Sequence, residues 1–162
     1  MRSCKSTSVV QAAYGLAFEE AGHKQWGKAM QDDVTDATKW AIDQGVADAS
    51  RICIYGGSYG GYAALMGVAK EPDLYKCAIS YVGVADLTIK YDEGDIPRSK
   101  AGRKFLEKTL GPKDEDRRFL SPVYLVDKIK VPVFLVHGQD DQRVSIVHAE
   151  NMRKALTAVG KP

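Results

Sequence analysis

The stretch 51–70, RICIYGGSYGGYAALMGVAK, decides the fold class of this chain. Residues 51–55 form a short β-rich run that stops at two glycines, and residues 62–70 have the pattern of a helix, which Pro72 would end. The sequence therefore predicts a strand, a tight turn and a helix in direct succession.

The same alternation continues along the chain. Residues 77–84 and 131–136 are predicted strands, the second with Pro132 near its start, where a missing N–H is tolerated. Apolar side chains recur at helical spacing in 30–44, 99–110 and 146–159. The polar, glycine- and proline-containing stretch 86–130 is predicted to consist of loops with one or two short helices.

Strands that alternate with helices imply an α/β fold, with a mostly parallel sheet covered by helices on both faces. The chain has 162 residues, 44% of them hydrophobic, and no linker of low complexity divides it, so one domain is expected.

Composition argues against several functional classes. The net charge of +2 comes from interspersed acidic and basic residues, which fits neither a nucleic-acid surface nor a lipid surface. The chain has no apolar run of the roughly 20 residues that a membrane helix needs. A soluble protein of the cytoplasm or periplasm is expected, and the sequence predicts no oligomeric state.

The three cysteines, Cys4, Cys53 and Cys77, have no Cys-x-x-Cys spacing and no histidine at ligand spacing. No metal site, cofactor or disulfide framework is predicted from them. Cys53 and Cys77 lie in apolar runs, where a thiol usually behaves as a small buried hydrophobic group.

The turn contains Gly-x-Ser-x-Gly, with Ser58 at its centre, between a strand and a helix. In this context the pattern predicts a nucleophile elbow, a turn that holds the serine in a strained backbone conformation above the sheet. The N–H of Tyr59 would then face the negative charge that develops on an attacked carbonyl. The alternative, a phosphate-binding loop, lacks both Gly-x-Gly-x-x-Gly spacing and a Walker lysine.

A serine nucleophile needs a base, and the base needs a carboxylate, in the chain order Ser, Asp, His for this fold. Asp141 follows the strand 131–136 at the end where sites gather in open α/β sheets. Its neighbour Asp140 is the alternative acid.

Two motifs together resemble the prolyl oligopeptidase family, in particular its dipeptidyl- and acylaminoacyl-peptidase branch. They are GGSYGGY at 56–62 and HGQDDQRV at 137–144. The resemblance implies an α/β-hydrolase fold truncated at both ends, with Ser58 as nucleophile, Asp141 as acid and peptides as substrates. It also implies that Val84, Leu87 and Val144 line the pocket for the residue before the cleaved bond.

The same resemblance places the catalytic histidine past Pro162. His23, His137 and His148 occupy other chain positions, so the chain as given is expected to lack a base and to be inactive. Two alternatives stay open for function: an esterase of the same fold, and a non-catalytic fragment or pseudo-enzyme.

The start of the chain departs from the resemblance. The family has a buried strand and an Asn-Phe-Arg-Gly-Ser loop before the position of Tyr14, whereas this chain has RSCKSTSVVQ at 2–11. A frame shift by two bases, with permitted codons, turns 3–11 into Leu-Gln-Val-Asn-Phe-Arg-Gly-Ser. Residues 1–13 are therefore predicted to be out of frame or disordered, and 14–162 to be a partial catalytic domain.

Overall fold

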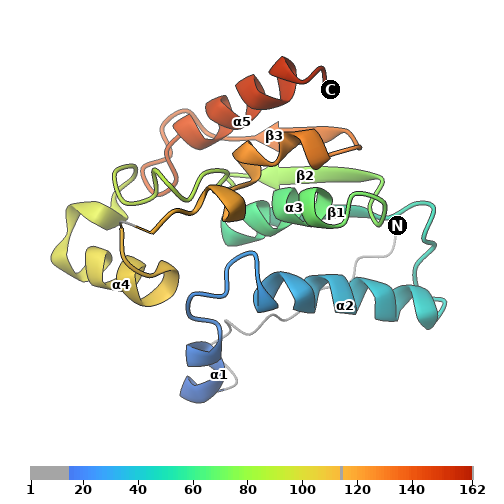
Figure 1. The fold of residues 1–162 in the computed structure, drawn as a ribbon, viewed down its shortest axis with the longest axis horizontal. Helices are drawn as coiled ribbons and strands as arrows, with labels where there is room; N and C mark the ends of the chain where they lie inside the picture. The colour runs from blue at the N-terminus through green and yellow to red at the C-terminus, as the bar shows by residue number, and fades with distance from the viewer. Residues whose placement is uncertain (1–14, 114, 162) are drawn as a thin grey trace.

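Three short strands form the centre of the fold in a computed structural model, which describes residues 15–113 and 115–161 (Figure 1). They are β1 (Cys53–Gly57), β2 (Cys77–Tyr81) and β3 (Val133–Val136). The strands lie in the order β1-β2-β3 and are all parallel. The predicted parallel α/β arrangement is confirmed.

Helices connect and surround these strands. The α-helices are α1 (Leu16–Ala21), α2 (Ala29–Asp43), α3 (Tyr59–Lys70), α4 (Lys100–Leu110) and α5 (Val147–Ala158). Four 3₁₀ turns, η2 (Ile96–Arg98), η3 (Arg118–Leu120), η4 (Pro122–Tyr124) and η5 (Val126–Lys128), interrupt the long stretch before β3. In Figure 1, α2, α3 and α5 follow one another from the bottom to the top of the molecule, and α4 lies apart on the left.

Element boundaries differ from the predictions mainly at the turns. Helix α3 starts at Tyr59, directly after the elbow serine and three residues earlier than predicted. Strand β2 ends at Tyr81 rather than at Val84, because Val82 has φ 46° and turns the chain out of the sheet. The helices predicted at 30–44, 99–110 and 146–159 are confirmed to within one residue at each end.

The two faces of the sheet differ in burial. One face packs against α3 and α5, and a core cluster there includes Ala78 of β2, Leu65 of α3 and Met152 of α5. Helix α2 packs on α3 on the same side. On the other face Tyr55 and Phe134 are 67% and 65% exposed. Among the described residues, the helical layer therefore covers one face, and the second predicted layer is not seen.

A disulfide joins Cys53 of β1 to Cys77 of β2 on that open face, where the two residues are paired in register with a Cα–Cα distance of 4.6 Å. The prediction of buried free thiols was wrong. Cys53 is exposed and Cys77 is half-buried, because both side chains project from the uncovered face. Cysteine spacing alone did not reveal the strand register that brings them together.

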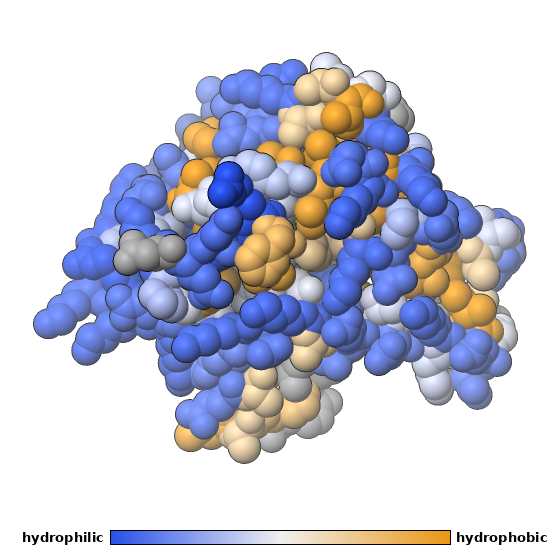
Figure 2. Space-filling model, in the orientation of Figure 1, coloured by the Kyte–Doolittle hydropathy of each residue, from blue (hydrophilic) through white to orange (hydrophobic). Residues whose placement is uncertain are grey.

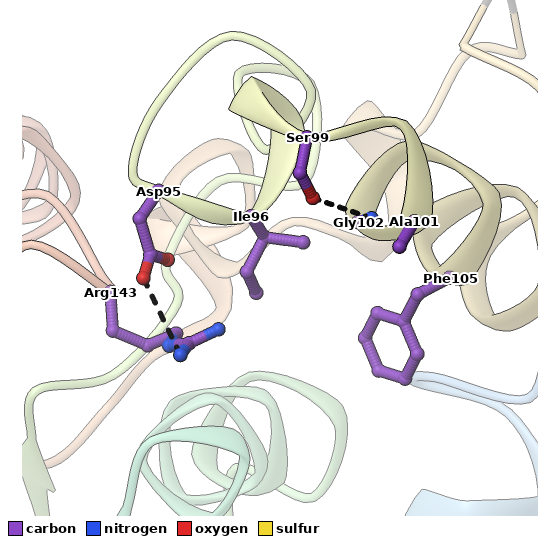
Figure 3. Close-up of a pocket in the computed structure, with 7 residues that line it drawn as sticks. All are labelled: Asp95, Ile96, Ser99, Ala101, Gly102, Phe105 and Arg143. Carbon is purple, nitrogen blue, oxygen red and sulfur yellow. Dashed lines mark hydrogen bonds and ion pairs between the residues drawn. The ribbon is translucent and has the colours of Figure 1, made fainter.

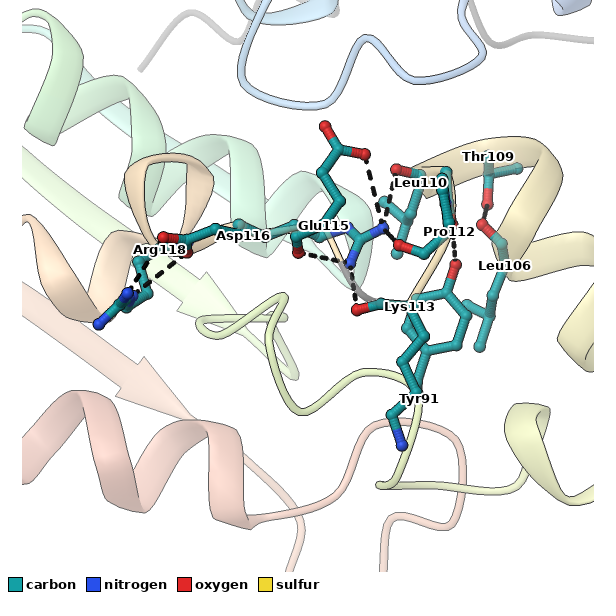
Figure 4. A network of polar contacts seen from close by, with 11 residues as sticks. Tyr91, Leu106, Thr109, Leu110, Pro112, Lys113, Glu115, Asp116 and Arg118 are labelled. Atoms are coloured by element: carbon teal, nitrogen blue, oxygen red, sulfur yellow. Dashed lines mark hydrogen bonds and ion pairs between the residues drawn. The ribbon is translucent and has the colours of Figure 1, made fainter.

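Arg117 organises the polar stretch between β2 and β3, around Pro112, Lys113 and Glu115, which are labelled in Figure 4. Its guanidinium is buried and donates to the carbonyls of Leu110, Pro112, Lys113 and Glu115. It also lies 5.2 Å from the ring centroid of Tyr91. One buried cation thus satisfies a run of backbone carbonyls that no helix or strand pairs, which gives this irregular segment a defined path.

The surface in the view of Figure 2 is mostly polar, with several separate apolar patches, as the mixed charge of the sequence predicts. In the part of the chain that the structure describes, no helix is both long and apolar enough to cross a membrane. The predicted out-of-frame segment 1–13 lies outside the described residues, so its prediction stands untested.

Candidate active site

Ser58 lies in the turn between β1 and α3, with φ 55° and ψ −117°. A non-glycine residue with this backbone is strained, and such residues persist only where the surroundings hold them. The N–H of Ser58 donates to the carbonyl of Tyr81 at 2.9 Å, which ties the turn to β2. The side chain does not cap α3 and is exposed, so the hydroxyl remains free for chemistry.

Glycines allow the strand and the helix to approach closely at this turn. A Cβ on Gly56 would lie within 3.0 Å of backbone atoms of Gly60, and a Cβ on Gly61 would lie 2.6 Å from the Cα of Gly83. Real Cβ atoms do not make such contacts. The elbow conformation therefore depends on these backbone contacts as well as on the serine itself.

Tyr59 is the first residue of α3, so its N–H has no acceptor inside the helix. This N–H lies at the positive end of the helix dipole, beside Ser58. The ring of Tyr59 is held by Trp26, with ring centroids 4.6 Å apart, and by Tyr62 at 5.8 Å. Burial raises the pKa of the Tyr59 hydroxyl, so the side chain stays neutral and serves to anchor the helix start.

Asp141 lies in the loop after β3, and its own side chain shapes that loop. Its Oδ1 accepts the N–H groups of Arg143 at 2.8 Å and Val144 at 2.9 Å. These backbone hydrogen bonds, that of Val144 first, lower the pKa of Asp141, and the nearby His137 and Lys90 act in the same direction. Its Oδ2 has no hydrogen bond within the described residues and can accept one from a base.

The sheet brings the two candidate groups to one edge. Ser58 follows the C-terminal end of β1, Asp141 follows the C-terminal end of β3, and β2 lies between them. The rival acid, Asp140, is exposed, and its side chain makes no hydrogen bond within the described residues. The choice of Asp141 rather than Asp140 as the acid stays a prediction.

Two of the three histidines make contacts that argue against a role as the base. The Nε2 of His137 lies 2.7 Å from the carbonyl oxygen of Val144, so this nitrogen must carry its hydrogen and cannot accept a proton from the serine. His148 is fully buried in α5, where its Nδ1 accepts the N–H of Asp86 at 3.3 Å. His23 lies between α1 and α2.

Burial lowers the pKa of His148 to about 3, and Lys90 and His137 act in the same direction. The imidazole is therefore neutral across the physiological range. A structural role for His148 stays a prediction, and its full burial is consistent with one.

The structure gathers the three predicted pocket residues in one place. Val84, Leu87 and Val144 belong to a single buried cluster, and each is at most 3% exposed. A cavity of about 520 Å³ lies next to the Asp141 loop, and Asp95, Phe105 and Arg143 are among the residues that line it (Figure 3). None of the three predicted residues lines this cavity, so their assignment stays a prediction.

Sequence reasoning missed several residues that shape the site. Val82 has a left-handed backbone just after β2, and its N–H donates to the carbonyl of Val136 at 2.7 Å. No sequence signal indicates a left-handed backbone at a β-branched residue such as Val82. Gly83 packs on the elbow glycine Gly61, and a glycine after a buried strand was a usable signal. Lys90 is buried beside the acid loop, and nothing in a polar segment indicated that burial.

The described residues contain no group of three or more His, Cys, Asp or Glu side chains that could hold a metal ion.

Comparison with known proteins places these motifs in a family. Residues 11–162 match the model of the prolyl oligopeptidase family. The chain is 33% identical over 165 residues to dipeptidyl aminopeptidase BIII of Pseudoxanthomonas mexicana, an alignment that covers 92% of this chain and 22% of that protein.

Solved structures of peptidases have the same fold as this chain. A Mycobacterium tuberculosis puromycin-hydrolyzing peptidase superposes with a TM-score of 0.83 and 30% identity, over 92% of this chain and 22% of that one. An acylaminoacyl peptidase in complex with Z-Gly-Gly-Phe-chloromethyl ketone superposes with a TM-score of 0.78 and 27% identity, over 90% and 23% of the two chains. The chain thus spans about a fifth of the length of these relatives.

Proposed function

The chain belongs to the prolyl oligopeptidase family, and we propose that it carries the nucleophile and the acid of a serine peptidase. The observation that carries the proposal is the strained Ser58 backbone, held at the same sheet edge as Asp141. The substrates proposed are short peptides, in line with the peptide-like inhibitor bound to the acylaminoacyl peptidase.

In the proposed reaction the Oγ of Ser58 attacks the peptide carbonyl, and a general base takes the hydroxyl proton. The carbonyl oxygen becomes an oxyanion that the N–H of Tyr59 and the dipole of α3 stabilise. The amine leaves with the proton that the base returns, and water then cleaves the acyl-enzyme. Asp141 would orient and stabilise the protonated base through its free Oδ2.

The base is not proposed to be His23, His137 or His148. Residues 1–162 alone are therefore expected to turn over peptides about 10⁴- to 10⁶-fold more slowly than a complete triad would. A Ser58-dependent turnover by this chain alone at ordinary peptidase rates would contradict that expectation.

Turnover of an aminoacyl-nitroanilide by the protein expressed from its complete reading frame tests the proposal. Ser58→Ala should abolish it, Asp141→Asn should lower kcat by about 10⁴-fold, and Asp140→Asn should keep most of it. If Asp140→Asn and Asp141→Asn exchange their effects, the acid is Asp140. If ester substrates alone are cleaved, the protein is an esterase of the same fold.

A further inference from the structure

Residues 90–95 contact the loop that carries Asp141. The N–H of Asp95 donates to the carbonyl of Gln142 at 2.8 Å, and the Asp95 carboxylate lies 3.4 Å from the guanidinium of Arg143 (Figure 3). Gly94 has φ 89°, and a Cβ there would lie 2.6 Å from the carbonyl oxygen of Arg143. Backbone and side-chain contacts thus join two segments that are about fifty residues apart in the sequence.

Lys90 adds a buried cation to this contact. The residue is 4% exposed, and its Nζ donates to the carbonyl of Arg143 at 3.4 Å. No carboxylate lies within ion-pair distance, 4.0 Å, of this ammonium in the described residues. A buried charge without a direct partner is costly, so a lysine at this position needs a reason.

The geometry of one peptide group supplies that reason. The carbonyl of Arg143 and the N–H of Val144 belong to the same peptide. The carbonyl faces the Lys90 ammonium, and the N–H donates to Asp141 Oδ1 at 2.9 Å. A cation at the carbonyl end polarises the peptide and strengthens the hydrogen bond that its N–H gives to the carboxylate.

We propose that Lys90 is a positioning residue for Asp141, which it holds in place through the peptide between Arg143 and Val144. The proposal rests on the proposed function only in giving Asp141 the role of catalytic acid. The other charged or titratable groups that face this pair are Asp95, Arg143, His137 and His148. The positioning itself concerns contacts within this chain.

Three variants test it. Lys90→Met removes the charge, Lys90→Arg keeps it, and Lys100→Met removes an exposed lysine from the start of α4 as a matched control. In the protein expressed from its complete reading frame, Lys90→Met should lower kcat by about tenfold to a hundredfold with KM little changed, because a misplaced group costs rate. Lys90→Arg should restore most of kcat, and Lys100→Met should leave it unchanged.

Nuclear magnetic resonance of the protein expressed from its complete reading frame gives a readout that needs no activity. The pKa of the Asp141 carboxyl should rise in Lys90→Met but not in Lys90→Arg or Lys100→Met, and the Val144 amide should exchange faster with solvent. An unchanged Asp141 pKa and an unchanged Val144 amide in a folded Lys90→Met variant would overturn the proposal.

The kinetic pattern separates the other outcomes. If Lys90→Met impairs acidic peptide substrates alone and leaves neutral ones untouched, Lys90 binds substrate and does not position Asp141. If the wild-type protein shows no Ser58-dependent turnover at all, the proposed function fails, and the resonance measurements still decide whether Lys90 positions Asp141.

Discussion

The two halves of the candidate site are held in different ways. The Ser58 elbow is fixed by steric contacts close in sequence, above all the approach of Gly56 to Gly60. The Asp141 loop is fixed by hydrogen bonds that its own carboxylate accepts and by contacts with Lys90 and Asp95. Local sterics can be recognised in a sequence motif, whereas a loop held by distant polar groups cannot.

The largest effect is expected from Gly56→Ala. Its Cβ would overlap backbone atoms of Gly60, which cannot rotate away, so the free energy of unfolding should fall by about 3 kcal/mol or more. Gly60→Ala is the matched control, because a Cβ there meets nothing within 4 Å and alanine favours a helix by about 1 kcal/mol. Urea unfolding of both variants measures the difference, and equal losses would contradict a steric elbow.

The disulfide should have the next largest effect. It closes a loop with a sequence separation of 24 that contains the whole elbow and α3, so its loss should cost about 3 kcal/mol through the entropy of the unfolded chain. Thermal unfolding of Cys53→Ser with Cys77→Ser, compared with the oxidised protein, measures this. Identical melting temperatures, with and without a reductant, would show that the bond contributes nothing.

The buried His148 predicts a smaller, pH-dependent effect. Because burial lowers its pKa to about 3 in the folded state, the unfolded chain binds a proton below about pH 6.5 and the folded chain does not. Stability should therefore fall as pH drops from 6.5 to 5, by up to about 2 kcal/mol, at about 1.4 kcal/mol per pH unit. His148→Gln should flatten this slope in urea unfolding between pH 7 and 5. A slope that survives the substitution would assign it to other groups.

The smallest effect separates the two neighbouring aspartates. Asp141→Asn weakens charge-assisted hydrogen bonds to two N–H groups, and the partly exposed site limits the loss to about 1 kcal/mol. Asp140→Asn should leave the free energy of unfolding unchanged, because that side chain is exposed. Equal effects in urea unfolding would mean that the Asp141 hydrogen bonds do not stabilise the loop.

The sequence predicted those parts of the fold that local patterns encode. The helix periodicity in 30–44 and the glycines around Ser58 depend on neighbours close in the chain, and the structure agrees with both. The choice of Asp141 over Asp140 needed the family motif, and it stays a prediction that the substitutions above test.

The sequence did not predict the contacts between residues far apart in the chain. Cys53 and Cys77 can form a disulfide because the register of β1 and β2 places them opposite each other. The sequence alone does not show the register of two strands. Lys90 lies in a polar segment and His148 in an amphipathic helix, and in both places the burial of the side chain depends on tertiary packing. Among the described residues one face of the sheet has no helices over it, and the alternation of elements does not show how helices are divided between the two faces.

Covalent labelling with a fluorophosphonate measures most directly whether Ser58 is an activated nucleophile. The protein expressed from its complete reading frame should take up one phosphonyl group, on the tryptic peptide 52–70, and Ser58→Ala should take up none. Asp141→Asn should label far more slowly than Asp140→Asn. A label on a different serine, or equal labelling after Ser58→Ala, would contradict the assignment of Ser58 as the nucleophile.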